Sequence, residues 1–125
     1  MSLPRSILIV DDEELLVTTL VRYFGGRGYA PTGVHGVAEA LAAIETSLAE
    51  KQPFAAILTD LQLPDGDGGR IVQVAHDRLP HCPVLVMTGS GSVSASVEAM
   101  RLGALTVLEK PMLVEKLRKM SPRQK

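Results

Sequence analysis

The chain has 125 residues, of which 46% are hydrophobic, a net charge of −1 and a single cysteine, Cys82. This size fits one domain with an aliphatic core, and the low charge gives no argument for direct nucleic-acid or membrane binding. One cysteine excludes an internal disulfide and leaves Cys82 as a loop or core filler, and no apolar run is long enough to cross a bilayer, so we expect a cytoplasmic protein.

Apolar runs alternate with helical patterns along the whole chain. Strands are predicted by the apolar runs at the start of the stretches 7–14, 54–60, 83–89 and 104–111. Residues 29–34 can form a short second strand. Apolar residues at helical spacing follow each strand and predict five helices. These residues are Leu16, Leu20 and Phe24; Val37, Ala40, Ile44 and Leu48; Ile71, Val74, Ala75 and Leu79; Val93, Val97 and Met100; and Leu113, Leu117 and Met120. We expect Val93, Val97 and Met100 to face the core.

Such strand–helix alternation predicts a parallel α/β sheet with right-handed crossovers. Five short units favour an open doubly wound sheet over a closed barrel. The common strand order is then 2-1-3-4-5, with five helices and a switch point between strands one and three. We expect a single domain over 1–125 with its core at about 6–120. Residues 1–3 are interpreted as a remnant of expression, and residues 121–125 as a tail or the start of a linker.

Charged or polar side chains follow four of these strands. Asp11 and Asp12 end the first strand, Asp60 ends the third, Thr88 the fourth and Lys110 the fifth. Because the carboxyl ends of parallel strands meet at one edge of the sheet, we expect these residues to share one crevice.

The acidic residues at this edge predict a metal site. Hard carboxylate oxygens favour Mg²⁺, or Mn²⁺, over zinc. We predict that Asp12 and Asp60 bind the ion directly, that Asp11 acts through water and that the Gln62 carbonyl is a further ligand. Alternatively, the Asp11–Asp12 pair caps the first helix. We interpret Asp65 as a solvated turn residue rather than a ligand.

Asp60 has two interpretations, because a carboxylate at the end of an apolar strand is costly unless it is paired. It is either a structural carboxylate satisfied by Lys110, or a nucleophile that carries a phosphoryl group as an acyl phosphate. In the second case the Lys110 ammonium, the Thr88 hydroxyl and the Gly89 backbone N–H would neutralise or hold phosphoryl oxygens.

With these residues in place, the chain resembles the receiver domain of two-component response regulators over nearly its whole length. The matching motifs are DDE at 11–13, Asp60 followed by Pro64, Asp67 and Gly68, TGSGS at 88–92, GA at 103–104 and KP at 110–111. The resemblance implies a flavodoxin-like fold, phosphorylation on Asp60 and Mg²⁺ at Asp11, Asp12, Asp60 and the Gln62 carbonyl. The stretch 86–104 is most similar to receivers attached to transcription regulators.

The resemblance also implies a mechanism. A sensor histidine kinase or a phosphotransfer protein would donate the phosphoryl group, and the protein would catalyse only its own phosphorylation and dephosphorylation. Thr88 would move to the phosphoryl group and Lys110 would pair with it. The face of the fourth helix, fifth strand and last helix would then change its partners, form a homodimer or control an output. That output is expected to be transcription, through an effector domain beyond this chain.

Two positions depart from the family pattern. Val107 stands where receivers usually have an aromatic residue, and Thr106 stands where an acidic residue is common. Valine cannot swing inward as that aromatic does. A stand-alone receiver or an interaction platform with weakened switching is therefore the main alternative. A Mg²⁺-dependent hydrolase with an Asp nucleophile would need an acid at Gln62, and the acidic 11–14 stretch opposes a flavin-phosphate site.

Overall fold

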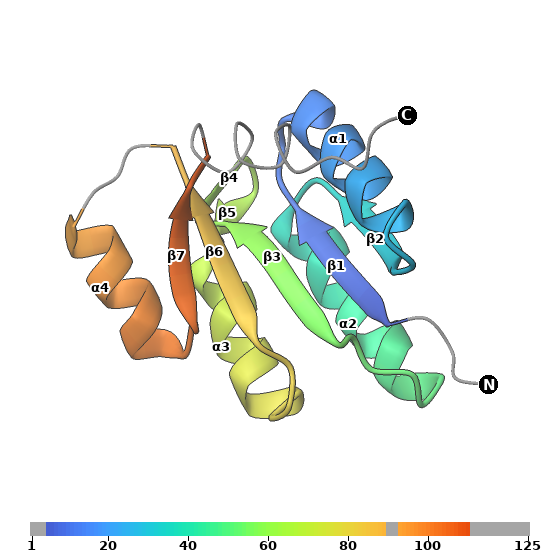
Figure 1. Ribbon diagram of the computed structural model, residues 1–125. Helices are drawn as coiled ribbons and strands as arrows, with labels where there is room; N and C mark the ends of the chain where they lie inside the picture. The colour runs from blue at the N-terminus through green and yellow to red at the C-terminus, as the bar shows by residue number, and fades with distance from the viewer. Residues whose placement is uncertain (1–4, 90–92, 111–125) are drawn as a thin grey trace.

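The computed structural model describes residues 5–89 and 93–110, which form a parallel sheet flanked by helices (Figure 1). The strands of this sheet are β1 (Ser6–Val10), β2 (Ala30–Val34), β3 (Ala56–Asp60), β6 (Val84–Thr88) and β7 (Thr106–Glu109). The helices are α1 (Glu14–Gly25), α2 (Val37–Ala49), α3 (Gly69–Arg78) and α4 (Val93–Leu102). None of these helices has the length and apolarity needed to cross a membrane.

The order of the sheet is β2-β1-β3-β6-β7, with every neighbouring pair parallel. Numbered as five sheet strands, this is the predicted order 2-1-3-4-5, so the expected fold class is confirmed. The carboxyl ends of the strands lie at one edge, the upper one in Figure 1. The predicted last helix, with Leu113, Leu117 and Met120, lies outside the described residues.

Both faces of the sheet are covered, because alternate residues of each buried strand point to opposite sides and nearly all of them are apolar. On one face, α2, α3 and Ala99 of α4 pack against Leu8, Val10, Ile57 and Val86. On the other face, α1 packs through Leu16, Val17 and Leu20 against Ile7, Ile9, Leu58 and Met87.

The expectation that Val93, Val97 and Met100 face the core is wrong. Their side chains are 77%, 61% and 52% exposed, whereas Ala99 is buried at 1%. Helix α4 contacts α3 and the edge strand β7, so only a narrow stripe of it is covered. The small Ala99 side chain lies in that covered stripe, whereas the spacing of Val93, Val97 and Met100 identifies an exposed side of the helix.

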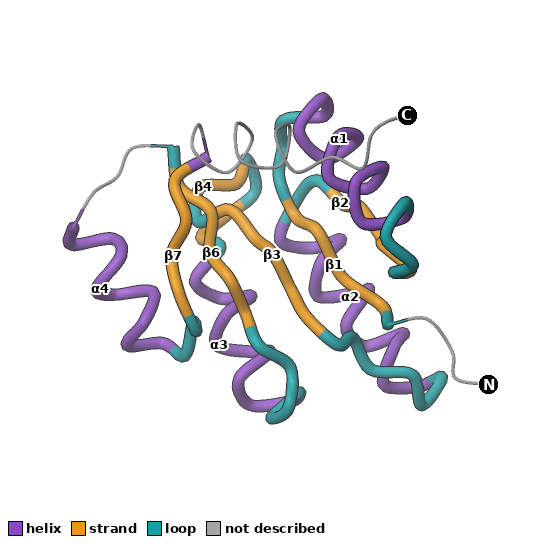
Figure 2. Tube along the Cα trace, viewed as in Figure 1, coloured by secondary structure: helices purple, strands orange, loops and turns teal. Residues whose placement is uncertain are grey.

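The stretch after Asp60, for which the sequence predicted only a loop over 61–69, contains a short antiparallel hairpin (Figure 2). Its strands are β4 (Gln62–Leu63) and β5 (Gly66–Asp67), joined by Pro64 and Asp65. A Cβ atom at Gly68 would lie 2.1 Å from the carbonyl oxygen of Asp60. Glycine at this position therefore lets the hairpin return tightly against the end of β3.

Candidate functional site

Three carboxylates meet where β1 and β3 end side by side. Asp11, Asp12 and Asp60 can each offer one oxygen such that the three atoms lie within 4.8 Å of one another. Asp11 and Asp60 are buried, whereas Asp12 is exposed. The predicted order of the sheet thus brings together the acidic residues that the sequence marked.

Lys110, which follows β7, bridges two of these carboxylates. Its Nζ lies 2.7 Å from Asp60 Oδ2 and 2.8 Å from Asp11 Oδ2. Burial by itself would lower the pKa of Lys110, but the Asp11 and Asp60 carboxylates outweigh it, so the pKa is raised and the ammonium stays charged. Burial also raises the pKa of Asp11, against the opposing effects of Lys110 and the Glu13 N–H.

Backbone amides hold the remaining oxygens of the two buried carboxylates. Glu13 donates its N–H to Asp11 Oδ1 at 2.8 Å, and Gln62 donates its N–H to Asp60 Oδ1 at 3.2 Å. The N-cap residue of α1 is Glu13, and its side chain makes no capping bond. Asp11 therefore orders the chain just before α1, but neither Asp11 nor Asp12 is the N-cap residue, so the capping alternative is wrong in that form. Asp12 is exposed.

A hollow of about 490 Å³ opens beside the carboxylates at this edge of the sheet. Its lining includes most of the residues that the sequence predicted for the site: Asp12, Asp60, Gln62, Thr88, Gly89 and Lys110. Asp11, with no exposed surface, lies beneath them. The structure thus brings all the predicted metal and phosphoryl residues to one place, and their individual roles stay predictions.

The donor set fits a hard divalent cation. Asp11 Oδ2 is buried and, among the described residues, has the ion pair with Lys110 but no correctly directed hydrogen bond. One ammonium cannot balance three carboxylates, and oxygen ligands of this kind suit Mg²⁺, which needs only one or two direct protein carboxylates. Of this set, exposed Asp12 and the buried Asp60 line the hollow, whereas Asp11 does not.

Val107 lies on the face of the sheet that also carries Thr88. Val107 pairs with Val86, and Thr88 pairs with Glu109 two residues farther along, so all four side chains point to the same side. Val107 is half-buried and packs against the core beneath α3 and α4. A branched aliphatic side chain therefore fills the position next to Thr88 that the family pattern reserves for an aromatic ring.

Two acidic residues of the hairpin have structural roles that the sequence analysis missed. Asp67 Oδ1 accepts the N–H of Gly69 at the start of α3. Asp65 is not a merely solvated turn residue, because its carboxylate accepts the N–H groups of Val37 and Ala38 at the start of α2. The bonds from Ala38 and Val37 lower the pKa of Asp65.

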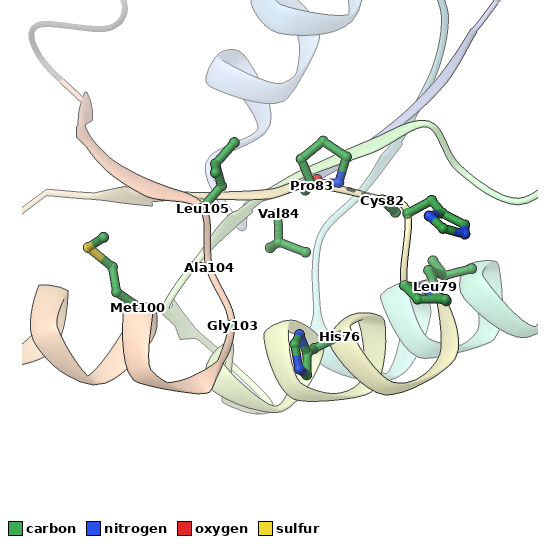
Figure 3. Close-up of a pocket in the computed structure, with 11 residues that line it drawn as sticks. His76, Leu79, Cys82, Pro83, Val84, Met100, Gly103, Ala104 and Leu105 are labelled. Atoms are coloured by element: carbon green, nitrogen blue, oxygen red, sulfur yellow. Dashed lines mark hydrogen bonds between the residues drawn. The ribbon is translucent and has the colours of Figure 1, made fainter.

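A second hollow lies at the opposite edge of the sheet, between α3, the start of β6 and the end of α4 (Figure 3). His76, Cys82 and Met100 are among its lining residues, and it includes none of the three clustered carboxylates. Burial raises the pKa of the Cys82 thiol to about 11, so the thiol stays protonated near neutral pH. This agrees with a packing role for Cys82.

Comparison with known proteins places the chain among receivers. The family model described as the response regulator receiver domain matches residues 7–121. The photosynthetic apparatus regulatory protein RegA of Cereibacter sphaeroides is 36% identical over 107 residues, which are 86% of this chain and 55% of RegA. The response regulator protein PilR of Pseudomonas aeruginosa is 38% identical over 121 residues, or 93% of this chain and 25% of PilR. This chain thus spans about half or less of these relatives.

A solved structure has the same fold and carries the chemistry of interest. It is a response regulator protein from Burkholderia pseudomallei with a phosphorylated aspartic acid, a calcium ion and citrate. Its TM-score to this chain is 0.78 at 33% identity, and the match covers 94% of this chain and 66% of that one.

Proposed function

This chain belongs to the response regulator receiver domain family, and from that premise we propose that Asp60 accepts a phosphoryl group in a Mg²⁺-dependent reaction. The observation that carries the proposal is the setting of Asp60. It is a buried carboxylate held by Lys110 and the Gln62 N–H, at the wall of a hollow that Asp12, Thr88 and others also line. The phosphorylated aspartic acid of the Burkholderia pseudomallei relative supports the same chemistry.

The donor is a phosphohistidine of a sensor histidine kinase or of a phosphotransfer protein. An Asp60 oxygen forms the new O–P bond while the N–P bond of the donor breaks, and the released imidazole nitrogen keeps the electron pair and takes up a proton. Little more is needed than positioning and neutralisation of charge on the phosphoryl oxygens. Lys110 supplies one positive charge, and the Thr88 hydroxyl and Gly89 N–H donate hydrogen bonds to the transferred group.

Asp12, Asp60 and the Gln62 carbonyl would hold the cation, with Asp11 acting through water, and a bound Mg²⁺, or Mn²⁺, would neutralise a further phosphoryl oxygen. The calcium ion of the Burkholderia pseudomallei relative is consistent with a divalent cation in this family. Water later attacks phosphorus and the bond between phosphorus and the Asp60 oxygen breaks, which regenerates the Asp60 carboxylate and releases inorganic phosphate. The chain thus catalyses only its own phosphorylation and dephosphorylation.

Phosphorylation would act as a switch by favouring one of two existing states of the face formed by α4, β7 and the predicted last helix. Exposed Val93, Val97 and Met100 give this face an apolar surface that a partner or a second copy can cover. RegA and PilR extend well beyond the matched part. We therefore propose a further C-terminal effector region, with control of transcription as the output.

Val107 favours one alternative function. Without an aromatic residue in β7, the change at Thr88 has a weaker route to the α4–β7 face, as in a receiver kept mainly as an interaction platform. A Mg²⁺-dependent phosphohydrolase has no such support, because Gln62 stands where a second catalytic acid would be needed.

The test is incubation with a small phosphodonor and Mg²⁺, followed by intact mass measurement. The original chain should gain the mass of one phosphoryl group, and chelation of Mg²⁺ should abolish the gain. Asp60→Ala should gain nothing, whereas the matched control Asp77→Ala, at an exposed position of α3, should behave like the original chain. A platform without phosphoacceptor activity would show no gain in any of the variants.

A further inference from the structure

Asp65 lies at the tip of the β4–β5 hairpin, well away from α2 in the sequence, yet it bonds the first turn of that helix. Its Oδ1 accepts the N–H of Val37 at 2.7 Å, and its Oδ2 accepts the N–H of Ala38 at 3.0 Å. Both carboxylate oxygens are therefore engaged by α2. The first N–H groups of a helix have no partner within the helix, so these two bonds satisfy donors that would otherwise be open.

Helix α2 lacks a cap of its own, and its first residues are shaped to receive Asp65. The N-cap residue is Gly36, which has no side chain with which to make a capping bond. A Cβ atom at Gly36 would lie 2.9 to 3.2 Å from the atoms of the Asp65 carboxyl group. Glycine at this position therefore leaves room for the carboxylate, and the negative charge also suits the positive end of the helix dipole.

The base of the same hairpin is fastened to the site. Gln62 opens β4 and donates its N–H to Asp60 Oδ1, and the Gly68 N–H at the far end of the hairpin donates to the carbonyl oxygen of Leu61 at 2.8 Å. Leu63, between base and tip, is buried in the same core cluster as Val37. The hairpin thus connects the candidate phosphoacceptor at one end with the first turn of α2 at the other.

We propose that Asp65 is a positioning residue: its carboxylate ties the hairpin to α2 and thereby holds Gln62 at the metal and phosphoryl site. This inference rests on the proposed function, because it concerns the residue whose carbonyl is expected to bind the cation. Asp65 itself touches neither the cation nor the phosphoryl group. The alternative is that Asp65 only stabilises α2, as any N-cap does.

The two roles are separated by moving the cap. Asp65→Ala removes both bonds. We expect roughly fivefold weaker Mg²⁺ binding and roughly fivefold slower phosphorylation by a small donor, because a fivefold change is the size expected when one helix cap is lost. The double variant Gly36→Asp with Asp65→Ala restores a capping carboxylate at α2 and the net charge, but it makes no bridge to the hairpin. Gly36 already has the extended backbone of an N-cap residue, with φ −160° and ψ 172°.

The double variant should regain the melting temperature of the original chain to within about 2 °C, against a loss of about 3–5 °C in Asp65→Ala. It should keep the weaker Mg²⁺ binding and slower phosphorylation. Hydrogen exchange gives a third readout. Protection of the Ala38 amide should fall in Asp65→Ala and return in the double variant, because an N-cap side chain bonds the second or third N–H of its helix, whereas protection of the Gln62 amide should fall in both. Asp65→Asn, which keeps one acceptor oxygen, should recover part of the Mg²⁺ affinity.

Recovery of Mg²⁺ binding and phosphorylation in the double variant would show that Asp65 is only a helix cap, and the proposal would be wrong. Unchanged Mg²⁺ affinity and Gln62 protection in Asp65→Ala would overturn it equally. Failure of the proposed function would look different, because the original chain itself would then take up no phosphoryl group. Mg²⁺ titration and amide exchange do not depend on that reaction, so they test Asp65 in either case.

Discussion

Replacement of Lys110 by methionine tests how the site balances its charges. The change keeps the length and apolar stem of the side chain but removes the ammonium that pairs with buried Asp11 and Asp60. Breaking a fully buried ion pair costs about 3–5 kcal/mol. Because the Lys110 side chain keeps 17% of its exposure, we expect the free energy of unfolding to fall by roughly 2 kcal/mol near pH 7 without Mg²⁺.

The loss should depend on pH in a defined direction. Burial already raises the pKa of Asp11 above its ordinary value of 3.8, and without Lys110 that pKa rises further. Between the raised folded value and 3.8, the folded state binds more protons than the unfolded state, so the free energy of unfolding increases as the pH falls. The difference between the original chain and Lys110→Met should therefore shrink as the pH is lowered from about 7 to about 5.

Urea unfolding at both pH values, with and without Mg²⁺, measures these differences. Added Mg²⁺ should recover much of the lost stability, because a cation replaces the missing positive charge. Lys51→Met, at an exposed position after α2, is the matched control and should change little at either pH. An equal loss at both pH values, or a loss that Mg²⁺ does not reduce, would refute the view that crowded carboxylates dominate this site.

Three further changes test other parts of the site. Asp12→Ala should weaken Mg²⁺ binding more than Asp11→Ala does, because Asp12 lines the hollow and Asp11 is covered; titration that gives equal losses would overturn this assignment. A beryllofluoride adduct should change hydrogen exchange mainly in α4 and only weakly in β7, because Val107 cannot swing as an aromatic does; a large change confined to β7 would show the opposite. Gly68→Ala should lower the free energy of unfolding by about 1–3 kcal/mol and slow phosphorylation, since its Cβ would lie 2.1 Å from the Asp60 carbonyl oxygen. The control is Gly26→Ala, whose Cβ would have no contact under 3.4 Å. Equal effects of the two substitutions would contradict this reasoning.

The residues at strand ends could be predicted from sequence because two local signals coincide there. An apolar run predicts a buried strand, and the residue that ends it must then lie at the edge of the sheet. The strand order then predicts that Asp11, Asp60, Thr88 and Lys110 lie close together, because the carboxyl ends of neighbouring parallel strands meet at one edge. The family match over residues 7–121 agrees with the resemblance to receivers that these motifs carried.

Two features could not be predicted, since each depends on what packs beside a segment. The spacing of Val93, Val97 and Met100 identifies an apolar stripe, but it does not reveal that the helix lies at the edge strand with this stripe uncovered. The bond from Asp65 to α2 joins residues 27 and 28 positions apart. The one local hint was a helix that begins after Gly36, without a capping side chain of its own.

The assignment of Asp60 as the phosphoacceptor is tested most directly by locating the acyl phosphate. After reaction with a small phosphodonor and Mg²⁺, borohydride reduces an aspartyl phosphate to the alcohol of homoserine, and peptide mass mapping identifies the residue. This product is expected at Asp60, and no product is expected when Mg²⁺ is chelated. A product at Asp11 or Asp12 instead, or no reducible acyl phosphate anywhere in the chain, would contradict the assignment of Asp60 as the phosphoacceptor.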